Sequence, residues 1–354
     1  MPTQQHILGI MSGTSCDGLD FCLTTFSEEE KGFTYTIIQT HSFLYSKDWK
    51  ERLEGAFNLS GRDLKRLEYD FSLFQVGCIN AFREIYPQLN IDIVATHGHT
   101  VFHNPDVGYT FQMTLGGLIA EQTKLITICN FRDQDVFLGG QGAPLVPIGD
   151  LHLFNAYDAC INLGGFANIS YQESIERIAY DLCPFNILMN PEANKYGLPY
   201  DESGKLARSG NVILSLLDGL NKLPYYKQSY PKSLSVEDLN VYYFRLLDNS
   251  NGRPEDILAT LVKHYIDVIS KVIDNKEKVL LTGGGVFNSF FVDNLKKVCK
   301  TQIVIPNPTL IEFKEALIFA FLGYLRLRNQ VNVLSSVTGS RTNHSSGQIY
   351  YPIL

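Results

Sequence analysis

Short runs that mix apolar and polar positions open this chain and predict β-strands. Three of them cover residues 6–10, 20–26 and 33–40. A turn rich in Gly, Ser and Thr joins the first two, and strand, turn and strand in this order predict a hairpin. The chain therefore begins with a small group of strands.

Apolar positions at helical spacing follow these strands. Ser60, with Asp63 three residues later, has the pattern of a helix N-terminal capping box. The apolar residues after it recur at intervals of three and four, which predicts a long helix. A second stripe lies further along, and residues 312–328 predict a helix whose basic end suits its dipole. The two stripes are Leu64, Leu67, Phe71, Phe74 and Cys78, and Ile257, Leu261, Tyr265, Val268 and Val272.

The second half of the chain repeats the theme of the first, because its strands also end in glycine-rich turns. Residues 195–254 interrupt it and are polar and irregular, with several prolines. The pattern predicts two βα halves, and open α/β sheets bind ligands at the carboxyl ends of their strands. Strands are expected at 91–96, 125–129, 158–163, 178–182 and 279–282, with Gly164-Gly165 and Gly283-Gly284-Gly285 at two of their ends.

The turn between the first two strands carries the most chemistry. It reads Gly9-Ile-Met-Ser-Gly-Thr-Ser-Cys-Asp-Gly18. Glycines let a backbone approach a ligand closely, and turn amides and hydroxyls donate to anionic oxygens. A neighbouring carboxylate suits a hydrated Mg²⁺. The turn therefore points to nucleotide phosphates, although it lacks the ending of a Walker A loop. A plain glycine-rich hairpin is the alternative.

Composition and charge narrow the classes of protein. A chain of 354 residues exceeds what one hydrophobic core usually serves, so two domains are expected. The net charge of −7 argues against a nucleic-acid binder. No apolar run is long enough for a bilayer, and no signal peptide is visible at the N-terminus. The seven cysteines are scattered and suit reduced thiols in a cytoplasmic protein.

Six segments, in order along nearly the whole chain, resemble the anhydro-N-acetylmuramic acid kinases. This family belongs to the actin, sugar-kinase and heat-shock-chaperone ATPase superfamily. One segment departs slightly, since His99 stands where the family has Gln. The segments are residues 9–18, Thr96-His-Gly-His-Thr-Val-Phe-His103, Asn130-Phe-Arg-Asp133 with residues 139–147, Asn162-Leu-Gly-Gly-Phe-Ala-Asn-Ile-Ser170, Thr282-Gly-Gly-Gly-Val-Phe-Asn288, and Lys314-Glu-Ala316 with Ser336-Val-Thr-Gly339.

The resemblance implies a fold and an activity. The fold is α/β, a two-domain actin-like ATPase (ribonuclease H-like) fold with a hinged central cleft. Residues 1–130 plus about 315–354 are expected in the first domain, and 131–314 in the second. The family uses ATP and Mg²⁺ to open the 1,6-anhydro ring of anhydro-N-acetylmuramic acid with water and phosphorylate O6, a step of cell-wall recycling. The expected partner is this small anhydro amino sugar, with a homodimer possible and neither nucleic acid nor membrane involved.

The resemblance also assigns roles to individual residues. Asp181 is the expected general base that activates the water. Asp17 is expected to contact Mg²⁺ through water. The nucleotide is expected at Gly13, Thr14, Ser15, Asp17, Gly18, Asp20, Gly164, Gly165, Asn168, Gly283, Gly284 and Gly285, and the sugar at Ser12, His97, Arg132 and Asn186.

One loop departs from the family's pattern. The family's Asp-Thr-Gly-Pro-Gly-Asn motif reads Asp181-Leu-Cys-Pro-Phe-Asn186 in this chain. Phe185 adds bulk and removes easy access to positive φ. The change is expected to narrow the sugar pocket, to reshape it for another ligand, or to end the chemistry. A kinase of a different sugar and an inactive binding homologue are therefore the alternatives.

Histidine and cysteine add no further candidate site. His97, His99 and His103 lie close together, but no carboxylate or cysteine completes a zinc pattern. Cys16 and Cys183 lie in expected ligand loops. Neither has a neighbouring base in the sequence that argues for nucleophilic catalysis.

Overall fold

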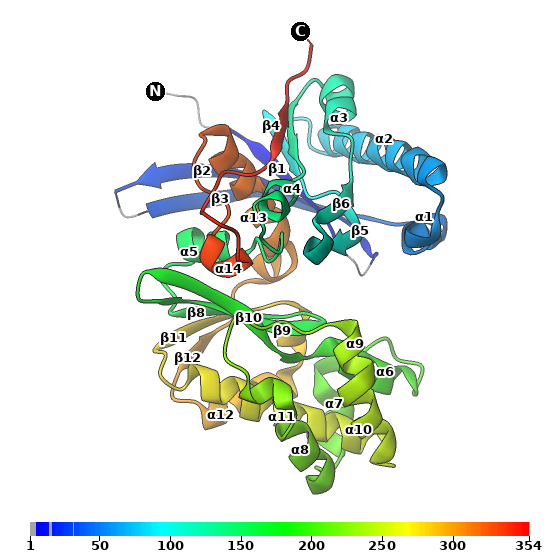
Figure 1. Ribbon diagram of the computed structural model, residues 1–354, viewed down its shortest axis with the longest axis vertical. Helices are drawn as coiled ribbons and strands as arrows, with labels where there is room; N and C mark the ends of the chain where they lie inside the picture. The colour runs from blue at the N-terminus through cyan, green and yellow to red at the C-terminus, as the bar shows by residue number, and fades with distance from the viewer. Residues whose placement is uncertain (1–4, 14–15, 31, 354) are drawn as a thin grey trace. The chain divides into compact units, whose positions relative to one another are not determined.

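Two compact α/β units make up the chain (Figure 1). The computed structural model describes residues 5–13, 16–30 and 32–353. Unit 1 comprises residues 1–153 and 313–354, and unit 2 comprises residues 154–312. Each unit is built around its own β-sheet.

The sheet of unit 1 has six strands. They are β1 (Ile7–Ser12), β2 (Gly18–Glu29), β3 (Gly32–Leu44), β4 (Ile93–Thr96), β7 (Ile126–Cys129) and β13 (Gln348–Tyr350), in the order β13-β7-β4-β1-β2-β3. β1, β2 and β3 are antiparallel neighbours, as the predicted hairpin requires. β4 and β7 run parallel to β1 on its other side. The parallel strands therefore present their carboxyl ends at one edge.

Two long helices cover opposite faces of this sheet. α2 (Gly61–Ile85) begins at the predicted cap, where the Ser60 hydroxyl accepts from the amide of Asp63. Its apolar stripe packs against side chains of β1 and β2. α13 (Pro308–Leu327) lies so close to β1 that a Cβ at Gly9 would stand 1.9 Å from the carbonyl oxygen of Ala316. Shorter elements are α1 (Lys47–Glu54), β5 (His99–Asn104), β6 (Tyr109–Met113), α3 (Gly116–Thr123), α4 (Asp133–Phe137), α5 (Pro147–Leu153) and α14 (Ser335–Thr338).

The sheet of unit 2 repeats the topology of the first. Its strands are β8 (Ala159–Leu163), β9 (Phe166–Glu173), β10 (Glu176–Pro184), β11 (Lys278–Thr282) and β12 (Gln302–Val304), in the order β10-β9-β8-β11-β12. β8, β9 and β10 are antiparallel neighbours, and β11 and β12 run parallel to β8 on its other side. Two α/β units with this shared strand order confirm the predicted fold class.

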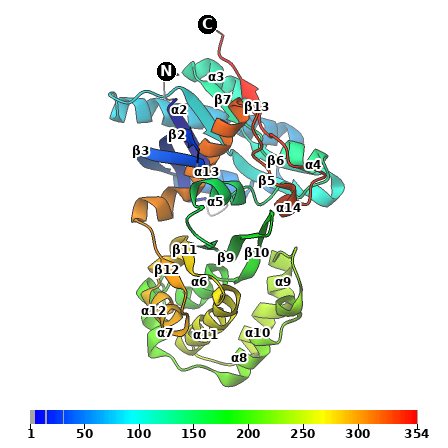
Figure 2. The ribbon, with the colours of Figure 1, turned by 90° about the vertical axis from the view of Figure 1, so that its left-hand side faces the viewer.

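The helices of unit 2 pack against one face of its sheet, as Figure 2 shows for α7, α11 and α12. Alternate residues of β8 and β9, such as Ile161, Leu163 and Ile169, point into this helical side. The residues between them face the opposite side. The helices are α6 (Asn186–Asn194), α7 (Lys205–Ser209), α8 (Leu214–Asn221), α9 (Val236–Asp238), α10 (Phe244–Asn249), α11 (Pro254–Ile273) and α12 (Ser289–Val298).

Residues 195–254 are more regular than their sequence indicates. The region holds α7, α8 and α10, and a π-helical turn at Leu239–Tyr243. Each piece is too short to show a clear apolar period of its own, so the prediction of an irregular region was wrong. α7 and α8 pack on α11, and α10 packs on α8 and on the π-helical turn. None of the helices in the described part of the chain has the length and hydropathy of a membrane span.

Residues 131–153, which the sequence places in the second domain, cluster with unit 1. Asp150 of α5 forms a buried ion pair with Lys314 of α13, with 2.8 Å between the carboxylate and Nζ. Ser346 Oγ donates to the carbonyl oxygen of Phe131 over 2.7 Å. These long-range contacts join the segment to the C-terminal part of unit 1, and local sequence carries no sign of them.

Candidate active site

The parallel strands of unit 1 bring three predicted site residues to one edge of the sheet. Ser12 ends β1, His97 directly follows β4, and Arg132 follows β7 after a short turn. Because the three strands are parallel neighbours, their carboxyl ends lie side by side. Arg132 and His97 are in direct contact, since Arg132 Nε donates to His97 Nε2 over 3.1 Å.

The contacts of His97 fix its protonation. Because Nε2 accepts from Arg132, we assign the ring proton to Nδ1, which donates to the carbonyl oxygen of Gly98 over 3.0 Å. Burial and the adjacent guanidinium hold the pKa of His97 well below its ordinary value, so the ring is neutral. Both ring nitrogens therefore have protein partners. A sugar contact by this ring, as predicted, requires one of those bonds to be exchanged.

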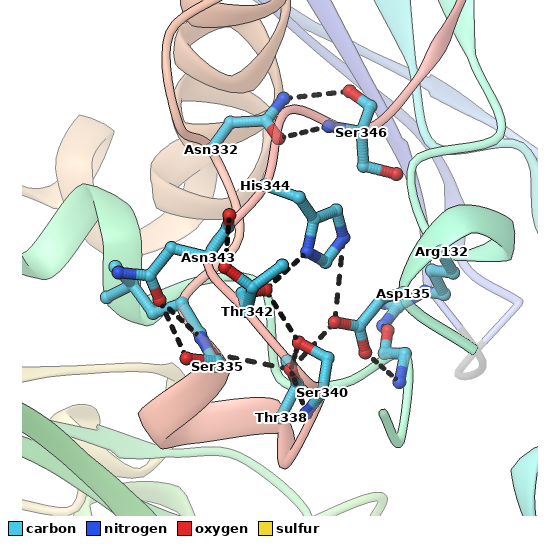
Figure 3. A network of polar contacts seen from close by, with 12 residues as sticks. Arg132, Asp135, Asn332, Ser335, Thr338, Ser340, Thr342, Asn343, His344 and Ser346 are labelled. Atoms are coloured by element: carbon cyan, nitrogen blue, oxygen red, sulfur yellow. Dashed lines mark hydrogen bonds and ion pairs between the residues drawn. The ribbon is translucent and has the colours of Figure 1, made fainter. Parts of the chain in front are cut away.

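A buried carboxylate ties the Arg132 region to the C-terminal segment (Figure 3). Asp135 Oδ1 accepts from the hydroxyl of Thr338, and Oδ2 accepts from the amide of Gly142, both over 2.7 Å. Arg132 Nη1 donates to the carbonyl oxygen of the same Gly142 over 2.7 Å. Sequence reasoning missed Asp135. The only signals for it were its position just after Arg132 and the C-terminal Ser-Val-Thr-Gly segment that supplies Thr338.

The expected phosphate loop is described at its two ends, because Thr14 and Ser15 lie outside the described residues. Asp17 is exposed, and its carboxylate lies 3.8 Å from Lys50 Nζ. At Gly18 a Cβ would stand 2.5 Å from the carbonyl oxygen of Phe43, so strand packing alone requires glycine there. Asp20 accepts from the hydroxyl of Ser42 over 2.6 Å.

Ser12 belongs to a buried polar cluster that the sequence did not reveal. Its Oγ lies 2.7 Å from Tyr45 Oη and 2.9 Å from His99 Nδ1. The other ring nitrogen of His99 lies 4.0 Å from Cys16 Sγ. Cys16 therefore does have a neighbouring base. Burial raises the pKa of the Cys16 thiol and lowers the pKa of His99 to about 4, so the pair stays uncharged and is not an activated nucleophile.

A row of polar side chains crosses the sheet of unit 2 on the face opposite its helices. Thr282 of β11 pairs with Asn162 of β8, Asn162 pairs with Asn168 of β9, and Asn168 pairs with Asp181 of β10. Directly paired residues share a face of a sheet. The structure thus brings Asn168 and Asp181 together. It adds Asn162, which the sequence showed only as the first residue of its motif.

Asp181 stands where a bulge interrupts the pairing of β10 with β9. Its Oδ2 accepts from the backbone amide of Leu234 over 2.9 Å, and its carbonyl oxygen accepts from the Tyr225 hydroxyl over 2.5 Å. Within the described residues Oδ1 accepts no hydrogen bond. Burial raises the pKa of the Asp181 carboxyl, against the opposing effect of the Leu234 amide. The group is therefore a stronger base than an ordinary aspartate.

The glycines of unit 2 differ in what requires them. Gly283 has φ +83°, and a Cβ there would stand 2.6 Å from Asn162 Oδ1, whereas Gly284 has open space. At Gly285 a Cβ would stand 2.6 Å from the Phe185 ring. The carbonyl oxygens of Gly164 and Gly165 accept from amides at the start of α6, and Asn186 Nδ2 donates to the carbonyl oxygen of Leu163 over 3.3 Å. In the turn after β11, packing thus requires glycine at Gly283 and Gly285 but not at Gly284.

The side chains that replace the family's loop residues point into the core of unit 2. Leu182, Cys183 and Phe185 are buried members of that core. The Phe185 ring packs 4.6 Å from the ring of Tyr265 and 5.0 Å from that of Phe291, between ring centroids. Its φ is −120°, which any residue adopts. The Phe185 ring thus packs in the core of unit 2, and the effect of the altered loop on the sugar pocket stays a prediction.

Comparisons with known proteins agree over nearly the full chain. Residues 5–352 match the family described as anhydro-N-acetylmuramic acid kinase. The anhydro-N-acetylmuramic acid kinases of Haemophilus influenzae and Aliivibrio fischeri are 33% and 34% identical, over 98% of this chain and 98% and 99% of theirs. A solved structure, the activator of the 2-hydroxyisocaproyl-CoA dehydratase from Clostridium difficile with bound ADPNP, is 13% identical over 92% of this chain and 97% of its own, with a TM-score of 0.40.

Proposed function

Because the chain belongs to the anhydro-N-acetylmuramic acid kinase family, we propose that it opens the 1,6-anhydro ring of anhydro-N-acetylmuramic acid with water and transfers the γ-phosphate of ATP to O6. The product is N-acetylmuramic acid 6-phosphate, made in the cytoplasm during cell-wall recycling. The observation that carries this proposal is the altered loop. Its new side chains lie in the core, while Asp181 stays in the polar row.

Asp181 is the proposed general base. Its Oδ1 accepts a proton from water as the water oxygen bonds to the anomeric carbon and the bond from that carbon to O6 breaks. The O6 electron pair then bonds to the γ-phosphorus, and ADP leaves. The Leu234 amide on Oδ2 holds the carboxylate in orientation. Tyr225 holds the backbone of the same residue.

Each unit by itself has proposed nucleotide contacts. In unit 1 they are Gly13, Thr14, Ser15, Asp17, Gly18 and Asp20. In unit 2 they are the two glycine turns and Asn168, and a Cβ at Gly284 would meet nothing within 4 Å. Ser12, His97, Arg132 and Asn186 are proposed for the sugar, with His97 exchanging one of its internal bonds.

Mg²⁺ suits the residues near the first loop. The described residues contain no group of three His, Cys, Asp or Glu side chains able to hold a metal. A cation bound mainly by water and phosphate oxygens needs only one or two carboxylates. Asp17 is exposed, so its carboxylate would hold the hydrated ion through water. The positive charge of the ion would offset the negative charge of the phosphates.

Radiolabelled ATP, offered with a panel of anhydro and reducing amino sugars, tests the proposal. We expect label transfer to anhydro-N-acetylmuramic acid and little to its ring-opened form. Transfer to another sugar only would establish the kinase of a different sugar. An inactive homologue would transfer no label to any of them while ATP with Mg²⁺ still raised its melting temperature.

A further inference from the structure

A buried cluster beneath the first loop has no assigned role in the reaction. It consists of Ser12, Cys16, Tyr45 and His99, each no more than 5% exposed. Ser12 and Cys16 flank the loop, Tyr45 follows β3, and His99 begins β5. The single imidazole therefore contacts both ends of the loop from below.

The hydrogen bonds of the cluster determine what Ser12 can offer. A serine hydroxyl has one proton. In one arrangement Tyr45 donates to Ser12, Ser12 donates to His99 Nδ1, and His99 Nε2–H points to Cys16 Sγ. In the reverse arrangement the thiol donates to Nε2, Nδ1–H donates to Ser12, and Ser12 donates to Tyr45. In both, Ser12 is bonded to Tyr45 and His99 at once. In a third arrangement Tyr45 and His99 Nδ1–H both donate to Ser12, which leaves the Ser12 proton for a ligand.

Packing keeps this imidazole and phenol in place. The His99 ring makes an edge contact with Phe71 of α2, with 6.0 Å between centroids. The Tyr45 ring lies 5.7 Å from Phe74 of the same helix. In the first two arrangements, His99 is the neutral imidazole, with one ring nitrogen donating and the other accepting. Its burial keeps it neutral at physiological pH.

We propose that His99 is a positioning residue for nucleotide binding: it contacts both Ser12 and Cys16 and so holds these two residues in place for the binding of the phosphates. The idea rests on the proposed function for the role of the loop.

Nucleotide affinity measured without sugar tests this directly. His99→Leu removes both polar contacts at similar size, and we expect it to weaken ATP·Mg²⁺ binding by about 3- to 10-fold, the effect of one or two uncharged buried hydrogen bonds. His99→Gln, which can still bond to Ser12, should bind within about twofold of the wild type, the range of a conserved hydrogen bond. The KM for ATP should follow the same order, while the KM for the sugar should change little.

His41→Leu is the matched control. This ring also bonds to a tyrosine, with 3.2 Å between His41 Nδ1 and Tyr86 Oη, but it lies on β3 away from the loop. Its nucleotide affinity should equal that of the wild type. If His99→Leu fails to fold, Tyr45→Phe replaces it, because this variant removes only the hydroxyl that reaches Ser12. It should weaken nucleotide binding and leave the KM for the sugar unchanged.

Wild-type nucleotide affinity in His99→Leu would overturn the proposal, and so would an equal loss in His99→Gln, since packing would then explain it. Wild-type affinity in Tyr45→Phe, where that variant is needed, would do the same. The proposed function fails differently, through absence of phosphate transfer to the anhydro sugar by the wild type. Binding of ATP·Mg²⁺ is measured in either case, so the two failures are distinguishable.

Discussion

Asp181 combines a raised pKa, one oxygen restrained by the Leu234 amide and a second oxygen with no hydrogen-bond donor among the described residues, as a general base requires. Asp181→Asn keeps the size of the side chain and an oxygen for the Leu234 amide. We therefore expect normal folding and nearly normal ATP binding, with turnover lower by about 10²- to 10⁴-fold, the usual contribution of a positioned base. Single-turnover transfer of labelled phosphate measures this.

Asp218→Asn is the control for that variant, because Asp218 is an exposed residue of α8 that pairs with Lys222. Its turnover should match the wild type. If Asp181→Asn kept full turnover on a proven substrate, the assignment of the base would be wrong.

Phe185 departs from the family's motif, and its side chain packs in the core of unit 2. We therefore expect it to contribute to the stability of the fold. Phe185→Ala should lower the free energy of unfolding by about 3–5 kcal/mol, the usual cost of emptying a buried aromatic site. Urea unfolding measures the loss. Phe287→Ala, at a ring that is 50% exposed, should change stability much less. An equally small effect at both positions would contradict the core role of Phe185.

At the scale of elements, the turn after β11 separates two kinds of glycine. Gly283→Ala forces a Cβ against Asn162 at a positive φ, so it should lower stability by more than about 1 kcal/mol and disturb the polar row. Gly284→Ala meets nothing within 4 Å and should fold normally. Thermal unfolding of the two variants gives the comparison. Equal melting temperatures would contradict it.

The helices show which sequence patterns allow a prediction of secondary structure. The helices α2, α11 and α13 are long enough for their apolar stripes to repeat several times, so each was predicted. The short helices between residues 195 and 254 contain one or two turns each, and they are stabilised by packing, α7 and α8 on α11 and α10 on α8. Neighbours distant in sequence therefore decide these elements.

At the scale of the whole molecule, buried histidines couple folding to pH. Burial lowers the pKa of His97 and brings those of His99 and His264 to about 4 and about 3. An unfolded histidine binds its proton near pH 6.5, so between that pH and about 4 the unfolded state binds more protons. The free energy of unfolding should therefore fall as the pH falls through this window.

A difference measurement isolates one of these groups. His264 bonds to Asn221 Oδ1 over 2.7 Å and to Tyr226 Oη over 2.8 Å. A glutamine side chain at this position can form both hydrogen bonds. Between pH 7 and pH 5 the free energy of unfolding should fall in both proteins. The fall should be about 1–2 kcal/mol smaller in His264→Gln than in the wild type. Urea unfolding at the two pH values measures this. Parallel losses in both proteins would show that His264 does not titrate in this range.

The sequence by itself determined many of the strands, the long helices, the glycine turns and the motif residues, because these depend on local periodicity and on residues close together in the chain. Tertiary structure decided which of them meet. Asp181 acquires its raised pKa from burial and its restraint from Leu234, far along the chain. Phe185 acquires its place in the core from Tyr265 and Phe291, and Ser12 its anchor from His99. Contacts of this kind form only when strands pair and helices pack, because the two partners of each contact lie far apart in the sequence.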